Sequence, residues 1–393
     1  MTGDERAGRD VPDEHGTRLD APDWWVYQGT GRPLQDIRLA EILPPPPPWR
    51  DFRGGPLPVD EDPPEDDGEA ERRLGARFQL TAREVDPREA DMVNAALFLR
   101  RPLLVTGPPG IGKSALPYRV ARELRLGRVL KWPIVGHTTL RSGLYSYDAI
   151  GRAEAAGTHR AARWPYPAPS EPAPSTREPT SPRGNTSGPG LGTPGSEDPP
   201  IGDFVRLGPV GTALLPRRLP RVLLIDELDK SEPDLPNDLL NLFEDGEFTI
   251  PELERLRSRS PEVNVLTADP GSIAAIADGR VQCRAFPFIV ITSNGEREFP
   301  SAFMRRCVRL ELQQPGHERL AAMVAAHMLD PDDLHRDRLI QDFLERNIPS
   351  GGLSADKLLD AVYLATSGAY RADDASWPRL LDALWQRLTS AVI

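Results

Sequence analysis

The sequence has no apolar run approaching the roughly 18 residues that a membrane-spanning helix needs, so we expect no membrane partner. It has only two cysteines, Cys283 and Cys307, and neither they nor its 6 histidines show metal-ligand spacing. We expect both cysteines to be reduced core thiols rather than a disulfide. Because the N-terminal residues include no apolar signal region, we expect a cytoplasmic protein.

An excess of positive charge is also lacking, since the formal net charge is −11. Proteins that bind nucleic acid non-specifically are more often basic, so this balance argues against a nucleic-acid partner. A local basic groove is compatible with this overall charge.

Proline, in contrast, is abundant, with 43 in 393 residues. The prolines cluster in two segments, and segments of that composition cannot bury enough apolar surface to offset their ordering entropy. We therefore predict that residues 1–75, which are acidic and Pro-rich, are largely disordered, and that residues 157–200 form a disordered insertion. The aromatic stretch 24–27 within the tail either docks on the chain's own core or is a linear motif for a partner.

Between and after these segments, short apolar runs alternate with helical periodicity, which predicts an α/β fold. We expect an α/β core over residues 76–315 and a small all-α domain over residues 316–393. The expected strands are 102–106, 128–135, 221–225, 285–292 and 308–312. The expected helices are 86–100, 114–124, 138–152 (a helix or helix-turn), 233–245, 316–329, 335–346, 353–366 and 376–391.

The strongest motif follows the first expected strand and opens a helix. It is a complete G-x-x-x-x-G-K-S phosphate loop made of Gly107, Pro108, Pro109, Gly110, Ile111, Gly112, Lys113 and Ser114. A helix N-terminus directs backbone N–H groups at one point, and glycines let the backbone approach a phosphate closely. Lys113 can reach the β- and γ-phosphates, and the Ser114 hydroxyl can bind Mg²⁺. The motif predicts binding of a nucleoside triphosphate.

Two acidic residues end the apolar run 222–225, at the carboxyl edge of the expected sheet. Asp226 is placed to bind Mg²⁺ with Ser114, and Glu227 is suited to polarise an attacking water. Asn294 follows the expected strand 285–292 and either orients that water, contacts the γ-phosphate, or is an ordinary turn residue.

A short helix over 299–307 ends in adjacent arginines, Arg305 and Arg306. Either they form surface salt bridges, or one of them stabilises transition-state charge on the nucleotide of a neighbouring subunit.

These motifs together resemble those of the AAA+ ATPases, and within them the MoxR-like group, over about residues 80–390. The resemblance identifies 107–114 as Walker A, 223–230 as Walker B, 292–294 as sensor 1 and Arg306 as the arginine finger, with Arg305 second. The stretch 207–215 resembles a segment that follows an insert in the MoxR-like group. The resemblance implies ATP hydrolysis with Mg²⁺, a homo-hexameric ring, and remodelling of a separate protein with a von Willebrand factor A domain.

One position departs from the family pattern, because Asp356 stands where a sensor 2 arginine is expected, followed by Lys357. Lys357 offers a point charge without the planar fork of arginine. This departure favours an alternative, a nucleotide-gated oligomeric switch with little hydrolysis, which the intact Glu227 and Arg306 oppose. A nucleic-acid-linked motor is a third hypothesis. The sequence has no Asn-Lys-x-Asp motif for guanine, so ATP is preferred.

Overall fold

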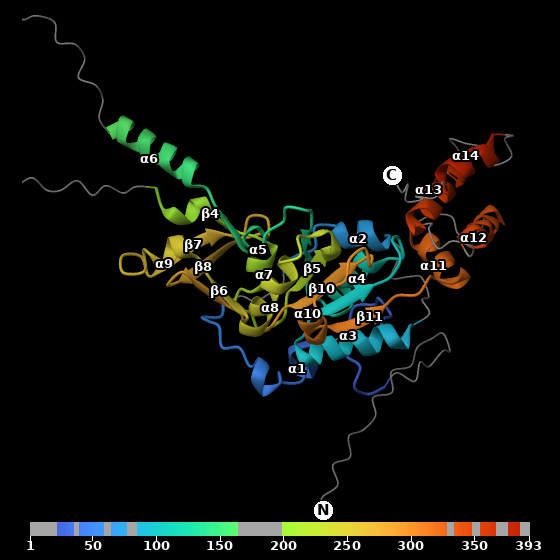
Figure 1. Cartoon of the computed structure of the whole chain (residues 1–393), viewed down its shortest axis with the longest axis horizontal. Coiled ribbons are helices and arrows are strands. Elements are labelled where there is room, and N and C mark those ends of the chain that lie inside the picture. Colours follow the sequence, from blue (N-terminus) through green and yellow to red (C-terminus); the bar gives the residue numbers. More distant parts are fainter. Residues whose placement is uncertain are drawn as a thin grey trace, which may run out of the picture.

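A computed structural model describes residues 22–34, 39–58, 64–76, 85–163, 199–327, 334–347, 354–366 and 376–385. Most of the predicted insertion 157–200 lies outside these ranges, although helix α6 (Ala149–Arg163) covers its first residues. Figure 1 shows a central sheet with helices packed around it, α6 projecting at one end and the last four helices at the other.

The central sheet contains five strands in the order β11-β1-β10-β5-β2, and every neighbouring pair is parallel. The strands are β1 (Leu103–Thr106), β2 (Leu130–Pro133), β5 (Val222–Asp226), β10 (Phe288–Ser293) and β11 (Val308–Glu311). Parallel strands covered on both faces read as continuous apolar runs, which explains why the sequence predicts all five. The expected α/β class is therefore confirmed.

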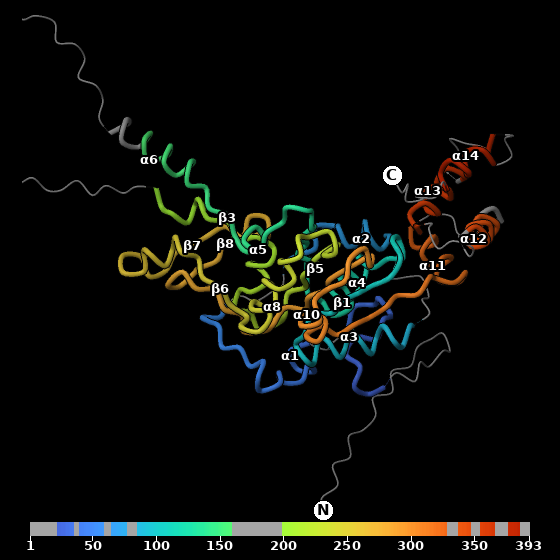
Figure 2. Tube along the Cα trace, viewed as in Figure 1, coloured from blue at the N-terminus to red at the C-terminus, as the bar shows by residue number. Residues whose placement is uncertain are grey.

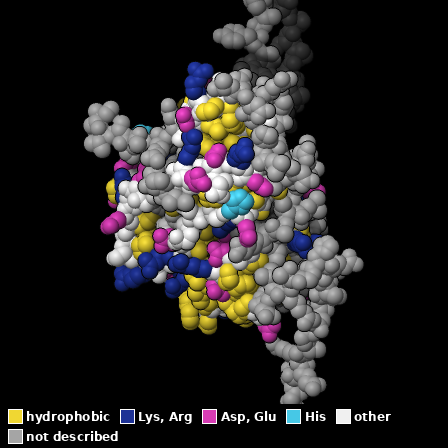
Figure 3. All heavy atoms as spheres, turned by 90° about the vertical axis from the view of Figure 1, so that its right-hand side faces the viewer, with side chains coloured by type: hydrophobic (Ala, Val, Ile, Leu, Met, Phe, Trp, Pro, Cys, Tyr) yellow, Lys and Arg dark blue, Asp and Glu magenta, His cyan; other side chains and the backbone are white. Residues whose placement is uncertain are grey.

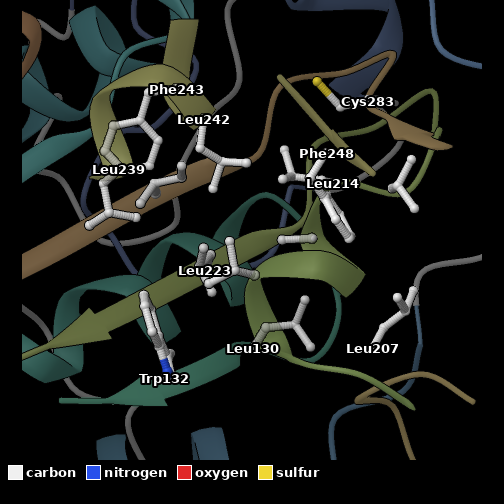
Figure 4. Close-up of a cluster of buried hydrophobic side chains, with 14 of the residues drawn as sticks. Leu130, Trp132, Leu207, Leu214, Leu223, Leu239, Leu242, Phe243, Phe248 and Cys283 are labelled. Atoms are coloured by element: carbon white, nitrogen blue, oxygen red, sulfur yellow. The ribbon is translucent and has the colours of Figure 1, made fainter. Parts of the chain in front are cut away.

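Alternate residues of these strands enter two different cores. In β5, Leu223 and Ile225 belong to one buried cluster, and Val222 and Leu224 belong to another. Figure 4 shows the first cluster, where side chains of β2 and β5 meet those of helix α8. The sheet is thus buried on both faces, and its carboxyl edge carries the polar residues.

Four of the helices that flank this sheet are α3 (Pro87–Leu99), α4 (Leu116–Glu123), α8 (Leu235–Asp245) and α10 (Ser301–Arg306). Helix α3 begins where predicted because Asp86 caps it, accepting hydrogen bonds from the backbone N–H groups of Arg88 and Glu89. Helix α8 ends at Gly246, whose left-handed conformation stops the helix.

A second sheet and a two-stranded ribbon lie beside the central sheet. The second sheet has the order β3-β4-β7-β8, and β6 pairs with β9. These strands are β3 (Tyr145–Tyr147), β4 (Val205–Leu207), β6 (Glu247–Thr249), β7 (Glu262–Leu266), β8 (Ile273–Ala277) and β9 (Arg280–Gln282). Short helices α5 (Leu140–Leu144), α7 (Pro209–Ala213) and α9 (Pro251–Glu254) accompany them. The predicted helix over 138–152 is therefore interrupted, because 145–147 pairs with β4.

The C-terminal part is helical, as predicted, with α11 (His317–His327), α12 (Leu334–Asn347), α13 (Ala355–Thr366) and α14 (Trp377–Leu384). These helices bury their own apolar cluster, which includes Leu358 and Trp385. A separate cluster is what a small domain needs, but the division at residue 316 stays a prediction.

The N-terminal segment differs from the largely disordered tail that composition predicts for residues 1–75. Its described residues include α1 (Leu39–Ile42) and α2 (Glu69–Leu74) and follow the outside of the core in Figure 2. Tyr27 is fully buried, and Glu123 of α4 accepts hydrogen bonds from the backbone N–H groups of Gln28, Gly29 and Gly31. These contacts are far apart in sequence, which is why local composition does not reveal them. The stretch 24–27 therefore contacts the chain's own core.

Candidate functional site

The phosphate loop connects β1 to α4 through a short 3₁₀ turn over Lys113–Ala115. Gly107 and Gly110 have φ values of +143° and +75°, which side-chain-bearing residues rarely adopt. A Cβ on Gly107 would press on Ile111 and on the carbonyl of Leu312, and one on Gly110 would collide with Ser354. The loop therefore needs glycine at both positions for its shape and for its contact with neighbouring segments.

Lys113 lies inside this loop rather than in solvent. Its ammonium group donates hydrogen bonds of 2.7 Å to the carbonyl oxygens of Gly107 and Pro108. Burial lowers the pKa of Lys113, and the carboxylates of Asp229, Glu227 and Asp226 oppose that shift. A cation held in this position faces the acidic end of β5, as an anion-binding loop requires.

Asp226, at the end of β5, is the meeting point of three strands. Its Oδ1 accepts hydrogen bonds from the hydroxyls of Ser114 (2.6 Å) and Thr292 (2.8 Å), while Lys131 Nζ lies 3.3 Å from Oδ2. The predicted pair of Ser114 and Asp226 is therefore in direct contact. A hydroxyl and a carboxylate are hard oxygen ligands that suit Mg²⁺, which usually keeps several waters and takes substrate phosphates as further ligands. In the described ranges, no group of three or more His, Cys, Asp or Glu residues is arranged so that it could hold a metal ion by itself.

Glu227 follows Asp226 and occupies the left-handed region, with φ 63° and ψ 50°. Its backbone N–H donates to the Thr292 hydroxyl at 2.8 Å, which fixes the residue to β10. Its carboxylate is 42% exposed and pairs with Lys230 at 2.7 Å, and this hydrogen bond raises the pKa of Lys230. In this conformation Glu227 is held beside Asp226 by its backbone, while its carboxylate faces Lys230.

Asn294 begins the loop after β10. Strand β10 lies between β1, which leads to the phosphate loop, and β5, which ends at Asp226. The buried carboxylate of Asp229 accepts hydrogen bonds from the backbone N–H groups of Asn294 (2.8 Å) and Glu296 (3.2 Å). Asp229 therefore fixes the loop that carries the Asn294 amide. Sequence reasoning missed the roles of Asp229 and Thr292; an acidic residue three positions after a strand-ending aspartate was the available signal.

Arg306 and Arg305 end helix α10, which contacts α8 and β11. Arg306 Nε donates to Glu244 Oε1 at 2.6 Å, and its Nη1 donates to the carbonyl of Ala302 at 3.2 Å. Arg305 donates to the carbonyl of Ser301 at 3.3 Å. None of the contacts described for these two arginines involves the phosphate loop, so the structure does not join them to the nucleotide site of their own chain.

The C-terminal helices reach the phosphate loop at the start of α13. The backbone N–H of Ala355 donates to the carbonyl of Gly110 at 3.1 Å. Lys357 belongs to this first turn, and its carbonyl accepts a hydrogen bond from Trp385. The position expected for sensor 2 therefore lies close to the loop in space although it is far from it in the sequence, with Asp356 and Lys357 in place of arginine.

A cavity of about 90 Å³ opens between the phosphate loop, α2, α4 and α11. Its apolar wall includes Ile111, Ala115, Leu320 and Met323. If phosphates bound at the loop, a planar apolar group attached to them would contact these side chains. Small-molecule sites typically combine apolar walls of this kind with a few polar groups.

Three arginines also line this cavity, and one buried carboxylate holds two of them. Glu89 Oε2 lies 2.8 Å from Arg119 and 3.5 Å from Arg319, while Glu89 Oε1 accepts a hydrogen bond from Tyr27. Arg319 belongs to α11, so Glu89 links the N-terminal segment, α4 and the C-terminal helices. This group could not be predicted from the sequence because its members are distant in the chain.

Comparisons with known proteins add little to this geometry. No protein-family profile matches the chain, and no curated protein matches it. Among solved structures, the chain is similar to the FIGL-1 AAA domain in complex with ADP, at 13% identity over 79% of this chain and 72% of that chain, with a TM-score of 0.29. In the described residues, no helix is long and apolar enough to cross a membrane.

Proposed function

We propose that this protein is an AAA+ ATPase that binds and hydrolyses ATP with Mg²⁺. The observation that carries the proposal is the contact of Ser114 and Thr292 with one oxygen of Asp226. Through it, a complete phosphate loop, an acidic strand end and a polar strand end meet at the carboxyl edge of one parallel sheet. Nucleotide sites in open α/β sheets lie at this edge.

Each residue has a proposed role in that reaction. The backbone of 107–112 and Lys113 bind the phosphates, and Ser114 and Asp226 hold Mg²⁺, which would neutralise charge on the phosphate oxygens. Glu227 accepts a proton from the attacking water after its carboxylate leaves Lys230. Asn294, fixed through Asp229, orients that water.

Two variants test the site. Lys113→Ala is expected to abolish nucleotide binding measured by calorimetry, because the loop loses its cation. Glu227→Gln is expected to keep ATP bound and slow phosphate release by about 10²–10⁴-fold, the range for a lost general base. The matched control is Glu252→Gln, since Glu252 pairs with Arg141 and Tyr145 outside the site. Tight ATP binding by Lys113→Ala, or unchanged turnover in Glu227→Gln, would contradict these assignments.

We also propose the finer features that the sequence resemblance implies. These are membership of the MoxR-like group, a homo-hexameric ring in the cytoplasm, a trans-acting Arg306, and remodelling or activation of a partner with a von Willebrand factor A domain. Mass measured with and without ATP tests the ring. Stimulation of ATP turnover by a purified protein with that domain tests the partner.

A second candidate function is a nucleotide-gated oligomeric switch with little hydrolysis. Two observations favour it: the Glu227 carboxylate is paired with Lys230, and α13 begins with Asp356 and Lys357 rather than an arginine. ATP-dependent assembly without phosphate release above background would support the switch and exclude the ATPase.

A nucleic-acid-linked motor is less well supported. In Figure 3, the described part of the face at the α11–α14 end carries acidic and basic side chains together with apolar ones. A duplex or single strand would instead call for a continuous basic track.

A further inference from the structure

The N-terminal segment contacts α8, which in turn contacts the helix that carries the proposed arginine finger, and this interaction is separate from the Tyr27–Glu89 contact. Arg50 is only 3% exposed, and its guanidinium lies 5.8 Å from the centre of the Phe286 ring. Its Nη1 donates to the carbonyl of Phe243 near the end of α8. Phe52 stacks on Phe286 at 5.6 Å, so apolar contact holds this part of the segment in place.

Arg50 shares a single carboxylate with Arg306. Glu244 Oε2 lies 3.2 Å from Arg50 Nη2, and Glu244 Oε1 lies 2.6 Å from Arg306 Nε. Each carboxylate oxygen therefore has its own guanidinium. Burial lowers the pKa of Arg50 and the charge of Arg306 lowers it further, whereas Glu244 opposes both effects.

This arrangement fixes Arg306 without using all of its donors. A guanidinium has five N–H groups in a rigid plane. The contacts with Glu244 and with the carbonyl of Ala302 use Nε and Nη1, and Nη2 takes part in neither. The side chain is still 39% exposed, so the outer edge of the guanidinium can reach an anion presented from outside the chain.

Arg50 keeps Glu244 in the position from which it binds Arg306. The buried guanidinium of Arg50 lies 3.2 Å from Glu244 Oε2, so Glu244 Oε1 stays directed at Arg306 Nε. Arg306 can therefore keep this hydrogen bond while the outer edge of its guanidinium contacts an anion.

We propose that Glu244, held by Arg50, is a positioning residue that orients Arg306 toward the nucleotide of a neighbouring copy of this chain. This inference rests on the proposed function, in which Arg306 acts in trans. It also gives Arg50 a role in hydrolysis, through the position of Glu244.

The test is steady-state ATP hydrolysis by the full chain carrying Glu244→Ala. Loss of orientation is expected to lower kcat about 10–100-fold with KM within about threefold, since a misplacement near 1 Å costs about 10²-fold. Glu244→Gln keeps an oxygen acceptor for Nε and is expected to lose about three- to tenfold. The matched control is Glu247→Ala, because Glu247 pairs with Arg280 and Gln282 and is expected to leave kcat unchanged.

Mixing separates a positioning role from simple damage to the fold. In an assembly of Glu244→Ala and Glu227→Gln chains, some interfaces combine an intact Glu227 site with an Arg306 whose Glu244 is intact. Activity is therefore expected to rise above that of either variant alone, once mixed assemblies are verified by mass. A fold defect, or a role in the chain's own site, gives no such recovery.

Arg306→Ala mixed with Glu227→Gln is the reference for these outcomes. If that pair recovers activity and Glu244→Ala with Glu227→Gln does not, the inference about Glu244 is overturned and the proposed function stands. If neither pair recovers in verified mixed assemblies, the trans-acting arginine itself is wrong. Unchanged kcat in Glu244→Ala overturns the inference directly. If Glu244→Ala does not fold, unchanged kcat in Glu244→Gln has the same meaning.

Discussion

Asn94 is expected to control whether residues 22–34 stay bound to the core. It lies on α3 with 0% exposure, and every hydrogen-bonding position of its amide is used. Oδ1 accepts from the backbone N–H groups of Val26 and Tyr27, each at 2.9 Å. Nδ2 donates to the carbonyls of Tyr27 (2.7 Å) and Ala90 (2.8 Å).

The substitution Asn94→Ala removes one hydrogen bond from each of three backbone groups of the segment: the N–H of Val26 and the N–H and carbonyl of Tyr27. Each such loss at a buried group costs about 1–3 kcal/mol, so the total is about 3–9 kcal/mol if the segment stays bound. Burial of the Val26 and Tyr27 side chains contributes about 1.5–3 kcal/mol each. Because release lets water satisfy the backbone groups, we expect residues 22–34 to detach while the central sheet stays folded.

Hydrogen exchange measures this difference residue by residue. Amide protection is expected to fall at Val26 and Tyr27, and at Gly29 and Gly31 where Glu123 accepts, while β1 and β10 keep theirs. The matched control is Asp91→Ala, which removes one hydrogen bond of 2.9 Å from the Trp25 indole and is expected to cost only about 0.5–1.5 kcal/mol. Unchanged protection of 22–34 in a folded Asn94→Ala chain would refute this reasoning.

Three further predictions follow from buried groups. Asp229→Ala removes the acceptor for two backbone N–H groups of the loop after β10. The free energy of unfolding measured in urea should therefore fall by about 2–6 kcal/mol, and ATP turnover should fall with it. Asp229→Asn should lose less on both measures. Burial raises the pKa values of Cys283 and Cys307 to about 12. Neither thiol should therefore react with a disulfide reagent at pH 8 until the chain is denatured. Fast labelling of the folded protein would contradict this prediction. Arg221→Met breaks a buried two-point ion pair with Asp269 (2.6 and 2.9 Å). It should lower the free energy of unfolding by about 3–5 kcal/mol while nucleotide affinity is retained. A loss of stability under about 1 kcal/mol would contradict this prediction.

The phosphate loop, β1 and the acidic end of β5 could be predicted from sequence because their signals are local. A strand, a glycine-rich turn and a lysine follow one another at fixed spacing within about ten residues, so the short local sequence is enough to predict the loop. The helices after residue 316 are similarly determined by their own periodicity. The second sheet is different: β3 has three residues, and β8 is rich in alanine, so neither differs from a loop or helix in propensity.

The N-terminal segment shows where composition misleads. Proline and acidic residues predict disorder there, yet Tyr27 and Arg50 are buried. The partners of the N-terminal segment include Asn94, Glu123 and Glu244, which are polar side chains far along the chain that make specific hydrogen bonds and ion pairs. No property of residues 1–75 alone contains that information. The same limit hid the cluster around Glu89, whose members come from three separate parts of the sequence.

The left-handed backbone of Glu227 sets stability against activity at a single residue. A residue with a side chain costs about 1–2 kcal/mol in that region, and glycine adopts it freely. A selection for thermal stability alone would therefore favour glycine at 227, and the resulting chain would be harder to melt. It would also lack the carboxylate on which the proposed hydrolysis depends. Melting temperature is thus the wrong guide to improving this protein at the position where its chemistry is expected.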